Sequence, residues 1–171
     1  MPCRCVKIEI QKEQENRLLK YSNLGALSAC LFNTISQSGL SGDSANQTLF
    51  QNALEAAKAY AADPQGWFIL IGPSGSGKTY LAAAIANERI KNGFPAFFQT
   101  VPDLLDHLRS AFAPDSAMSY DELFARVCQA PFLVLDDLDI KQSKEWAREK
   151  LYQLLNHRFI HELPTVITSS L

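Results

Sequence analysis

The chain has 171 residues, of which 47% are hydrophobic and 20% are charged, and 16 Lys and Arg residues against 18 Asp and Glu residues give a net charge of −2. This length suffices for one domain with a hydrophobic core. The net charge excludes a strongly basic protein that coats nucleic acid, but it allows a local basic patch. No apolar run approaches the roughly 20 residues that span a membrane, and no secretion signal follows Met1, so we expect a cytoplasmic protein with reduced thiols.

Residues 1–48 are predicted to form an N-terminal arm and a linker. Residues 6–21 are highly charged and compatible with a helix, whereas residues 33–48 are rich in Ser, Asn, Gln and Gly, a composition typical of a loop. Five basic residues of the arm could contact nucleic acid or a partner protein, although such a run is more often a solvated helix face. They are Arg4, Lys7, Lys12, Arg17 and Lys20.

Residues 49–171 are predicted to alternate between helices and strands. The helices are expected at 49–62, 78–92, from Thr100 onward, from Ser119 to about 129, and from about 143 to 161. The strands are expected at 67–72, 94–100, 132–137 and 165–170. The first strand is a continuous apolar run, which is typical of a strand buried on both faces. The alternation predicts an α/β domain of three layers, with a parallel sheet of about four strands between helices.

Two of these helices begin with the spacing of a capping box. Thr100 precedes Asp103 by three residues, and Ser119 precedes Glu122 by the same interval. In a capping box the first side chain accepts a hydrogen bond from the backbone N–H of the acidic residue, which satisfies a donor in the first turn of the helix. Both positions are therefore predicted to be helix starts.

Residues 72–79, GPSGSGKT, fit the pattern G-x-x-x-x-G-K-[ST] of a Walker A phosphate-binding loop. Glycines let backbone N–H groups approach phosphate oxygens, and the following helix adds its positive N-terminal end. Lys78 can reach the β- and γ-phosphates, and the Thr79 hydroxyl can bind Mg²⁺. A buried strand before and a helix after distinguish this loop from a chance turn. ATP is expected to bind at Gly72, Pro73, Ser74, Gly75, Ser76, Gly77, Lys78, Thr79 and Tyr80.

Acidic and hydroxyl side chains are expected at the ends of the last two strands. Asp136 and Asp137 follow the apolar run FLVL, and ligands of parallel sheets lie beyond the carboxyl ends of the strands. Asp136 is therefore expected to hold Mg²⁺ and Asp137 to activate a water. The alternative is that both are solvated acids in a turn, as two adjacent acids without such a context often are. Asp139 is expected to be a solvated loop residue. Thr168, Ser169 and Ser170 end the last strand, where a hydroxyl could contact the γ-phosphate or the attacking water, with ordinary capping of the strand end as the alternative.

The Walker A loop, VPDLLDHLR (101–109), LVLDDL (133–138) and the ending LYQLLNHRF…LPTVITSS (151–170) together resemble the helicase-loader branch of AAA+ ATPases. That branch includes DnaC-like replication proteins and IstB-like helpers of transposition. The resemblance implies a P-loop NTPase fold of the ASCE type, with Asp136 and Asp137 as the Walker B acids. It places Ser170 at sensor 1, where the family usually carries Asn. It also implies a replicative helicase or a transposase as partner, single-stranded DNA as a further ligand, and ATP-dependent oligomers, although this chain can be monomeric.

Three further expectations follow from the resemblance. Phe32 matches an aromatic residue near the nucleotide base, with a core position as the alternative. Cys3 and Cys5 match the trailing half of a four-cysteine zinc site, but two thiolates one residue apart cannot complete a tetrahedral site. The family's arginine finger and sensor 2 would lie beyond residue 171, so the chain is expected to be truncated and to hydrolyse ATP weakly alone.

Three functions are compatible with these motifs. The leading interpretation is an ATPase that uses ATP as a switch in helicase loading or transposition. A small-molecule kinase shares the phosphate loop, but it needs an arginine-rich lid, and only Arg89, Arg109 and Arg126 lie between the loop and the acidic pair. A nucleotide-binding module without hydrolysis is the third alternative, which Ser170 at sensor 1 and the missing arginine finger favour.

Overall fold

The computed structural model describes residues 22–37, 39, 42–141 and 143–170, so the arm expected at 6–21 lies outside the described residues. The helices are α2 (Ser44–Ala62), α3 (Lys78–Lys91), α4 (Val101–Ser110), α5 (Tyr120–Gln129) and α6 (Glu145–Ile160), and two short 3₁₀ helices precede them, η1 (Asn23–Leu27) and η2 (Phe32–Thr34). The strands are β1 (Trp67–Ile71), β2 (Phe97–Thr100), β3 (Leu133–Asp136) and β4 (Thr165–Ser169). Within this part of the chain, no helix combines the length and apolar character that crossing a bilayer requires.

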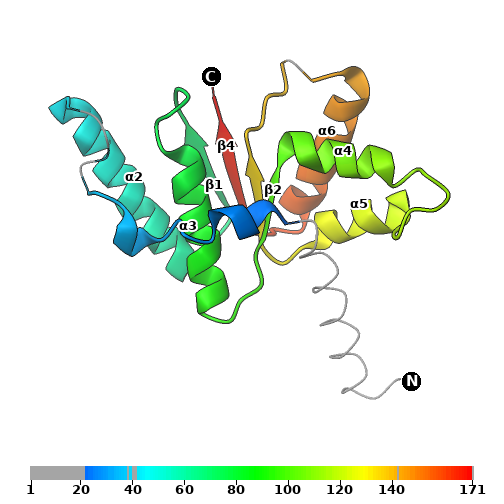
Figure 1. Ribbon diagram of the computed structural model, residues 1–171, viewed down its shortest axis with the longest axis horizontal. Helices are drawn as coiled ribbons and strands as arrows, with labels where there is room; N and C mark the ends of the chain where they lie inside the picture. Colours follow the sequence, from blue (N-terminus) through cyan, green and yellow to red (C-terminus); the bar gives the residue numbers. More distant parts are fainter. Residues whose placement is uncertain (1–21, 38, 40–41, 142, 171) are drawn as a thin grey trace.

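The four strands form one parallel sheet in the order β1-β4-β3-β2 (Figure 1). One apolar core lies between the sheet and the layer of η1, α2 and α3, and a second lies between the sheet and the layer of α4, α5 and α6. The carboxyl ends of all four strands therefore lie along one edge of the molecule's central layer. These findings confirm the predicted three-layer α/β architecture.

Strand β1 differs from its prediction. The apolar sequence predicted burial on both faces, but the side chains of Ile69 and Ile71 are 52% and 59% exposed, whereas Leu70 between them is buried. Within the described residues β1 pairs with β4 alone, so it forms an edge of the sheet. An apolar run indicates that a segment is a strand, but it does not indicate where the strand lies in the sheet.

The opposite edge of the sheet, at β2, is covered by two polar side chains. The Ser22 hydroxyl donates to the carbonyl of Phe98 at 3.0 Å and accepts from the Phe98 N–H at 3.2 Å. The side-chain Oδ1 of Asn23 accepts from the Gln99 side chain at 2.9 Å and from the Thr100 N–H at 3.0 Å. Three of these four bonds satisfy backbone groups of β2 that would otherwise be open to a further strand.

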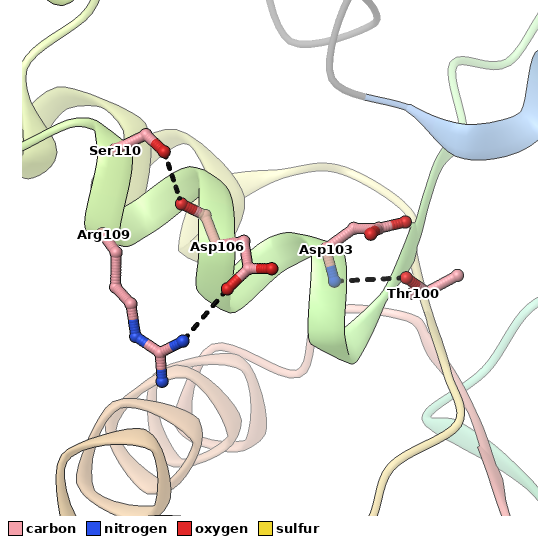
Figure 2. Close-up of polar contacts among 5 residues, drawn as sticks. All are labelled: Thr100, Asp103, Asp106, Arg109 and Ser110. Carbon is pink, nitrogen blue, oxygen red and sulfur yellow. Dashed lines mark hydrogen bonds and ion pairs between the residues drawn. The ribbon is translucent and has the colours of Figure 1, made fainter.

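Helix α4 begins with the predicted cap. The Thr100 hydroxyl accepts a hydrogen bond from the Asp103 N–H at 3.3 Å (Figure 2). The reciprocal bond of a capping box does not form, because the Thr100 N–H donates to the N-terminal segment that covers β2. Further along α4, Arg109 forms an ion pair with Asp106 at 3.0 Å, and the Ser110 hydroxyl donates to the Asp106 carbonyl at 2.9 Å (Figure 2).

Side-chain caps also set the starts of α2 and α5. The Ser119 hydroxyl accepts from the Glu122 N–H at 3.3 Å, as its spacing predicted. The carboxylate of Asp43 accepts from the Ala45 N–H at 3.4 Å, and α2 consequently begins at Ser44, five residues before the predicted start at residue 49.

A charged side chain is buried at the amino ends of the strands. Arg158, in the last turn of α6, has no exposed surface, and its Nε donates to the Thr165 hydroxyl at 2.8 Å. Its terminal nitrogens donate to the backbone carbonyls of Val127, Cys128, Ala130 and Pro164. Three of these carbonyls lie at the C-terminal end of α5, where the helix dipole favours a cation. Burial lowers the pKa of Arg158 to about 10, which leaves the guanidinium protonated at neutral pH.

Candidate functional site

A cavity of about 390 Å³ lies between the phosphate loop and the carboxyl ends of β3 and β4. Six of the nine residues predicted to bind the nucleotide line it, together with both acids of the predicted Walker B pair and Ser170. Gly72, Pro73 and Ser76 belong to the same loop but do not line the cavity. The full lining is Ser74, Gly75, Gly77, Lys78, Thr79, Tyr80, Asp136, Asp137, Thr168 and Ser170.

The phosphate loop leads directly into the N-terminus of α3. Gly77 is the N-cap of α3, has a φ of 88°, and offers no side chain to the first turn. The positive φ favours glycine at this position, and a Cβ would in addition lie 3.0 Å from the ring of Phe50, which would have to move slightly. Other helices carry side-chain caps at Asp43, Thr100 and Ser119. The first-turn N–H groups of α3 are therefore left to bind a ligand at the positive end of the helix dipole.

Lys78 lies folded over the loop that precedes it. Its ammonium donates to the carbonyl of Gly72 at 2.8 Å and to that of Pro73 at 2.7 Å. An ammonium has three N–H donors, and here two of them are bonded to the loop. These contacts place a positive charge at the cavity, where it can neutralise a phosphate group.

Asp136 and Thr79, the residues predicted to hold Mg²⁺, are in direct contact. The Thr79 hydroxyl lies 3.0 Å from each oxygen of the Asp136 carboxylate, and the buried Thr168 hydroxyl donates to Oδ1 of the same carboxylate at 2.7 Å. Hydroxyl and carboxylate oxygens are ligands that Mg²⁺ accepts, with phosphate and water oxygens completing its shell. This pair of oxygen donors beside the phosphate loop therefore fits a nucleotide-bound Mg²⁺.

Asp137 differs from Asp136 in both backbone conformation and exposure. Its φ is 61°, in the left-handed region that Asp tolerates better than most residues, and its side chain is exposed. The Asp137 N–H donates to the Thr168 hydroxyl at 2.9 Å, and the Leu138 N–H donates to the Thr168 carbonyl at 2.8 Å. This turn explains how two adjacent acids occupy different environments: Asp136 is bonded within the protein, whereas Asp137 is open to the cavity.

The remaining predicted residues have different locations. Ser170 lines the cavity. Asp139 is half-buried rather than fully exposed as predicted, and its backbone carbonyl accepts a hydrogen bond from the Ser143 hydroxyl. Phe32 packs, half-buried, against the core beneath α2 and α3 and is not among the cavity-lining residues. Cys3 and Cys5 lie outside the described residues, so the expected partial zinc site is not placed.

Thr168 was one of three hydroxyl residues expected at the end of the last strand, but only Ser170 among them was predicted to belong to the site, whereas Thr168 also lines the cavity. Its side chain is 1% exposed and is bonded to both residues of the acidic pair. The sequence contained a signal for it, because side chains two residues apart in a strand share a face. Since Ser170 was expected to face the ligand, Thr168 should have been expected on the same side.

Residues 32–171 match the family model described as IstB-like ATP binding protein. The chain belongs to this family. The match covers most of the chain and includes both the phosphate loop and the acidic pair, so it confirms the resemblance that the motifs indicated.

Individual relatives of this IstB-like protein come from replication and from insertion sequences. The replicative helicase loader DnaI of Bacillus subtilis is 28% identical over 170 residues, which are 96% of this chain and 51% of DnaI. An insertion sequence IS21-like putative ATP-binding protein of Bacteroides fragilis is 31% identical over 102 residues, covering 60% of this chain and 37% of the relative. The crystal structure of the DnaC helicase loader matches with a TM-score of 0.69 and 22% identity, over 84% of this chain and 77% of that chain, which shows a shared fold. The chain spans about half the length of DnaI.

Proposed function

We propose that this IstB-like protein binds ATP together with Mg²⁺, hydrolyses the nucleotide, and uses it as a switch in DNA replication or transposition. The observation that carries this proposal is the convergence of the uncapped N-terminus of α3, Lys78 and the acids Asp136 and Asp137 on one cavity. The helix terminus and the lysine attract a triphosphate, and the two carboxylates serve a metal ion and a water.

Each polar side chain of the cavity has a role in this proposal. Lys78 binds the β- and γ-phosphates, and Thr79 and Asp136 hold Mg²⁺, which when bound neutralises charge on the same phosphates. Asp137, which is open to the cavity, accepts a proton from the attacking water. Ser170 contacts the γ-phosphate or that water.

The positions of the arginines favour water over a small molecule as the phosphate acceptor. A kinase lid needs arginines near the transferred phosphate, but Arg89, Arg109 and Arg126 are not among the cavity-lining residues. The guanidinium of Arg89 lies 4.1 Å from the centre of the Phe94 ring, and Arg109 and Arg126 form ion pairs along their own helices. These three arginines are therefore engaged elsewhere in the fold.

The relatives support a role for the proposed ATP switch in DNA replication or transposition. DnaI is a replicative helicase loader, and the Bacteroides protein belongs to an insertion sequence. By this family relationship, the proposed partner is a replicative helicase or a transposase, and single-stranded DNA is the proposed ligand that stimulates turnover.

The test measures ATP affinity and phosphate release with and without single-stranded DNA. We expect Mg²⁺-dependent binding of ATP and DNA-stimulated release of phosphate. Lys78→Ala should weaken ATP binding by about 100-fold, because the charge-assisted contacts of the Lys78 ammonium with the β- and γ-phosphates are lost. Lys91→Ala, a change of an exposed lysine at the far end of α3, is the control and should bind normally.

Other outcomes would contradict specific parts of the proposal. Unchanged affinity in Lys78→Ala would remove the phosphate loop from the site. Phosphate transfer to a nucleoside monophosphate would indicate a kinase, and tight binding without turnover would indicate a module that does not hydrolyse ATP.

A further inference from the structure

Thr168 contacts both acids of the site although it belongs to another strand. It lies on β4, its side chain is almost fully buried, and its hydroxyl is bonded to Asp136 and to the backbone of Asp137. Strand β4 stands beside β3 in the sheet, so the hydroxyl reaches across from the neighbouring strand. Asp136 thereby has a protein partner other than Thr79.

The direction of these hydrogen bonds is fixed. A hydroxyl carries one proton and can also accept, whereas a backbone N–H can only donate. Because the Asp137 N–H donates to the Thr168 oxygen at 2.9 Å, the Thr168 proton is available to the Asp136 carboxylate, whose Oδ1 lies 2.7 Å away. The result is a chain from the Asp137 backbone through Thr168 to the Asp136 carboxylate, and its members strengthen one another.

The two hydroxyls bonded to Asp136 differ in what else can bind them. Thr79 is exposed at the cavity, where a metal ion or a phosphate can compete for its oxygen. Thr168 is 1% exposed, and both of its side-chain partners belong to the turn at the end of β3. Thr168 therefore holds the carboxylate in its rotamer whichever partner Thr79 has.

Thr168 also supports the unusual backbone of Asp137. A non-glycine residue at a φ of 61° requires support from its surroundings. Two bonds to Thr168 provide it, one from the Asp137 N–H to the hydroxyl and one from the Leu138 N–H to the carbonyl. Only the first of these bonds depends on the Thr168 side chain.

We propose that Thr168 is a positioning residue that orients the Asp136 carboxylate toward the metal and fixes the turn that presents Asp137 to the cavity. This inference deepens the proposed function and rests on it. The side chain acts through the two acids and does not itself need to touch the nucleotide.

The experiment compares Thr168→Val, which keeps the branched shape but removes the hydroxyl, with Thr168→Ser, which keeps the hydroxyl. Binding of a fluorescent ATP analogue is titrated in EDTA and at increasing Mg²⁺. We expect Thr168→Val to raise the Mg²⁺ concentration for half-maximal binding by about tenfold or more, because a hydrogen bond to a charged group is lost. Affinity in EDTA should change by less than about twofold, and Thr168→Ser should restore the Mg²⁺ dependence to within about threefold.

Ser169→Ala is the matched control, because the Ser169 hydroxyl on the same strand donates to the carbonyl of Leu138 and not to Asp136. It should retain the Mg²⁺ dependence of the unaltered protein. Urea unfolding of each variant identifies a simple loss of folding, which would lower binding equally in EDTA and in Mg²⁺.

The inference is overturned if Thr168→Val keeps the unaltered Mg²⁺ dependence, or if Thr168→Ser is as impaired as Thr168→Val. If the unaltered protein binds no nucleotide, the proposed function fails and the inference fails with it. If the unaltered protein binds normally and Thr168→Val behaves like it, only the inference fails.

Discussion

Thr165 and Thr168 lie three residues apart on β4, and each hydroxyl is bonded to a buried charged side chain. At the amino end the charge belongs to Arg158, which is surrounded by carbonyls and has no exposed surface. At the carboxyl end the charge belongs to Asp136, which borders a cavity that also contains an exposed acid and a lysine. The amino end of β4, here called the closed end, buries its charge and is expected to contribute to stability, whereas the carboxyl end, here called the open end, has groups available for a ligand.

The two ends also differ in how their charges are compensated. Arg158 is stabilised by fixed backbone dipoles, which need no other molecule. Asp136 is stabilised by two hydroxyls, and one of these can exchange its partner. Substitutions at the two ends should therefore separate effects on stability from effects on nucleotide chemistry.

The largest effect is expected at the open end, from Asp137→Asn. Asn tolerates the left-handed backbone as Asp does, so the turn should persist while the proton acceptor is lost. We expect nucleotide affinity to change little and the rate of phosphate release to fall by about 10²- to 10⁴-fold. Asp137→Gly, which relieves the backbone and also removes the carboxylate, should show the same loss; an unaffected rate in both variants would mean that Asp137 is not the base.

The next effect is expected at the closed end, from Arg158→Met. The change leaves several buried carbonyls and the Thr165 hydroxyl without their donor, so the free energy of unfolding should fall by about 3 kcal/mol. Urea unfolding measures the change, and the folded fraction should still bind ATP normally. Arg148→Met, at an exposed position of α6, should change stability by less than about 0.5 kcal/mol. A similar loss in both variants would contradict the role assigned to the buried guanidinium.

The closed end should also respond to alkaline pH. Burial raises the pKa of the Cys128 thiol from 9.0 to about 11, although Arg158 opposes the shift. A group whose pKa is higher in the folded state stabilises the fold below its unfolded pKa, and that contribution is lost as the pH rises toward the folded pKa. We expect Cys128 to contribute a fall of about 1 kcal/mol in the free energy of unfolding between pH 8 and 10, as measured by urea unfolding at each pH. Cys128→Ala should remove most of this slope, and an equally steep slope in that variant would assign the effect elsewhere.

The smallest effect is expected from Thr100→Ala, because the cap of α4 belongs to neither end of β4. Loss of the bond from the Asp103 N–H should reduce the free energy of unfolding by about 1 kcal/mol, with ATP affinity unchanged. Thr48→Ala is the control, since the Thr48 hydroxyl bonds back to the carbonyl of Ser44 within α2 and caps no helix end. Thermal unfolding should show a lower midpoint for Thr100→Ala alone, and equal midpoints would contradict the cap.

The sequence predicted the elements well because each carries its own local signal. The phosphate loop fixed the start of α3, and the spacings from Thr100 and Ser119 located the starts of α4 and α5. The start of α2 was predicted too late, because a polar stretch resembles a loop even where Asp43 begins a helix.

The features that the sequence did not reveal depend on contacts between strands and helices distant in the chain. Nothing local to Ile69 and Ile71 indicates that β1 lies at an edge, because strand order is a property of the whole sheet. An arginine in the last turn of a helix usually lies in solvent, and Arg158 is buried only because carbonyls from α5 converge on it. The bond from Thr168 to Asp136 likewise exists only because β3 and β4 are neighbours.

The two edges of the sheet differ in whether their backbone groups are open to a further strand. At β2, the side chains of Ser22 and Asn23 occupy the hydrogen-bonding positions that an added strand would need. At β1, the described residues leave the outer backbone groups without a strand, next to the exposed Ile69 and Ile71. Within the described residues, the edge without side-chain cover is therefore the one formed by β1, the strand that leads into the phosphate loop.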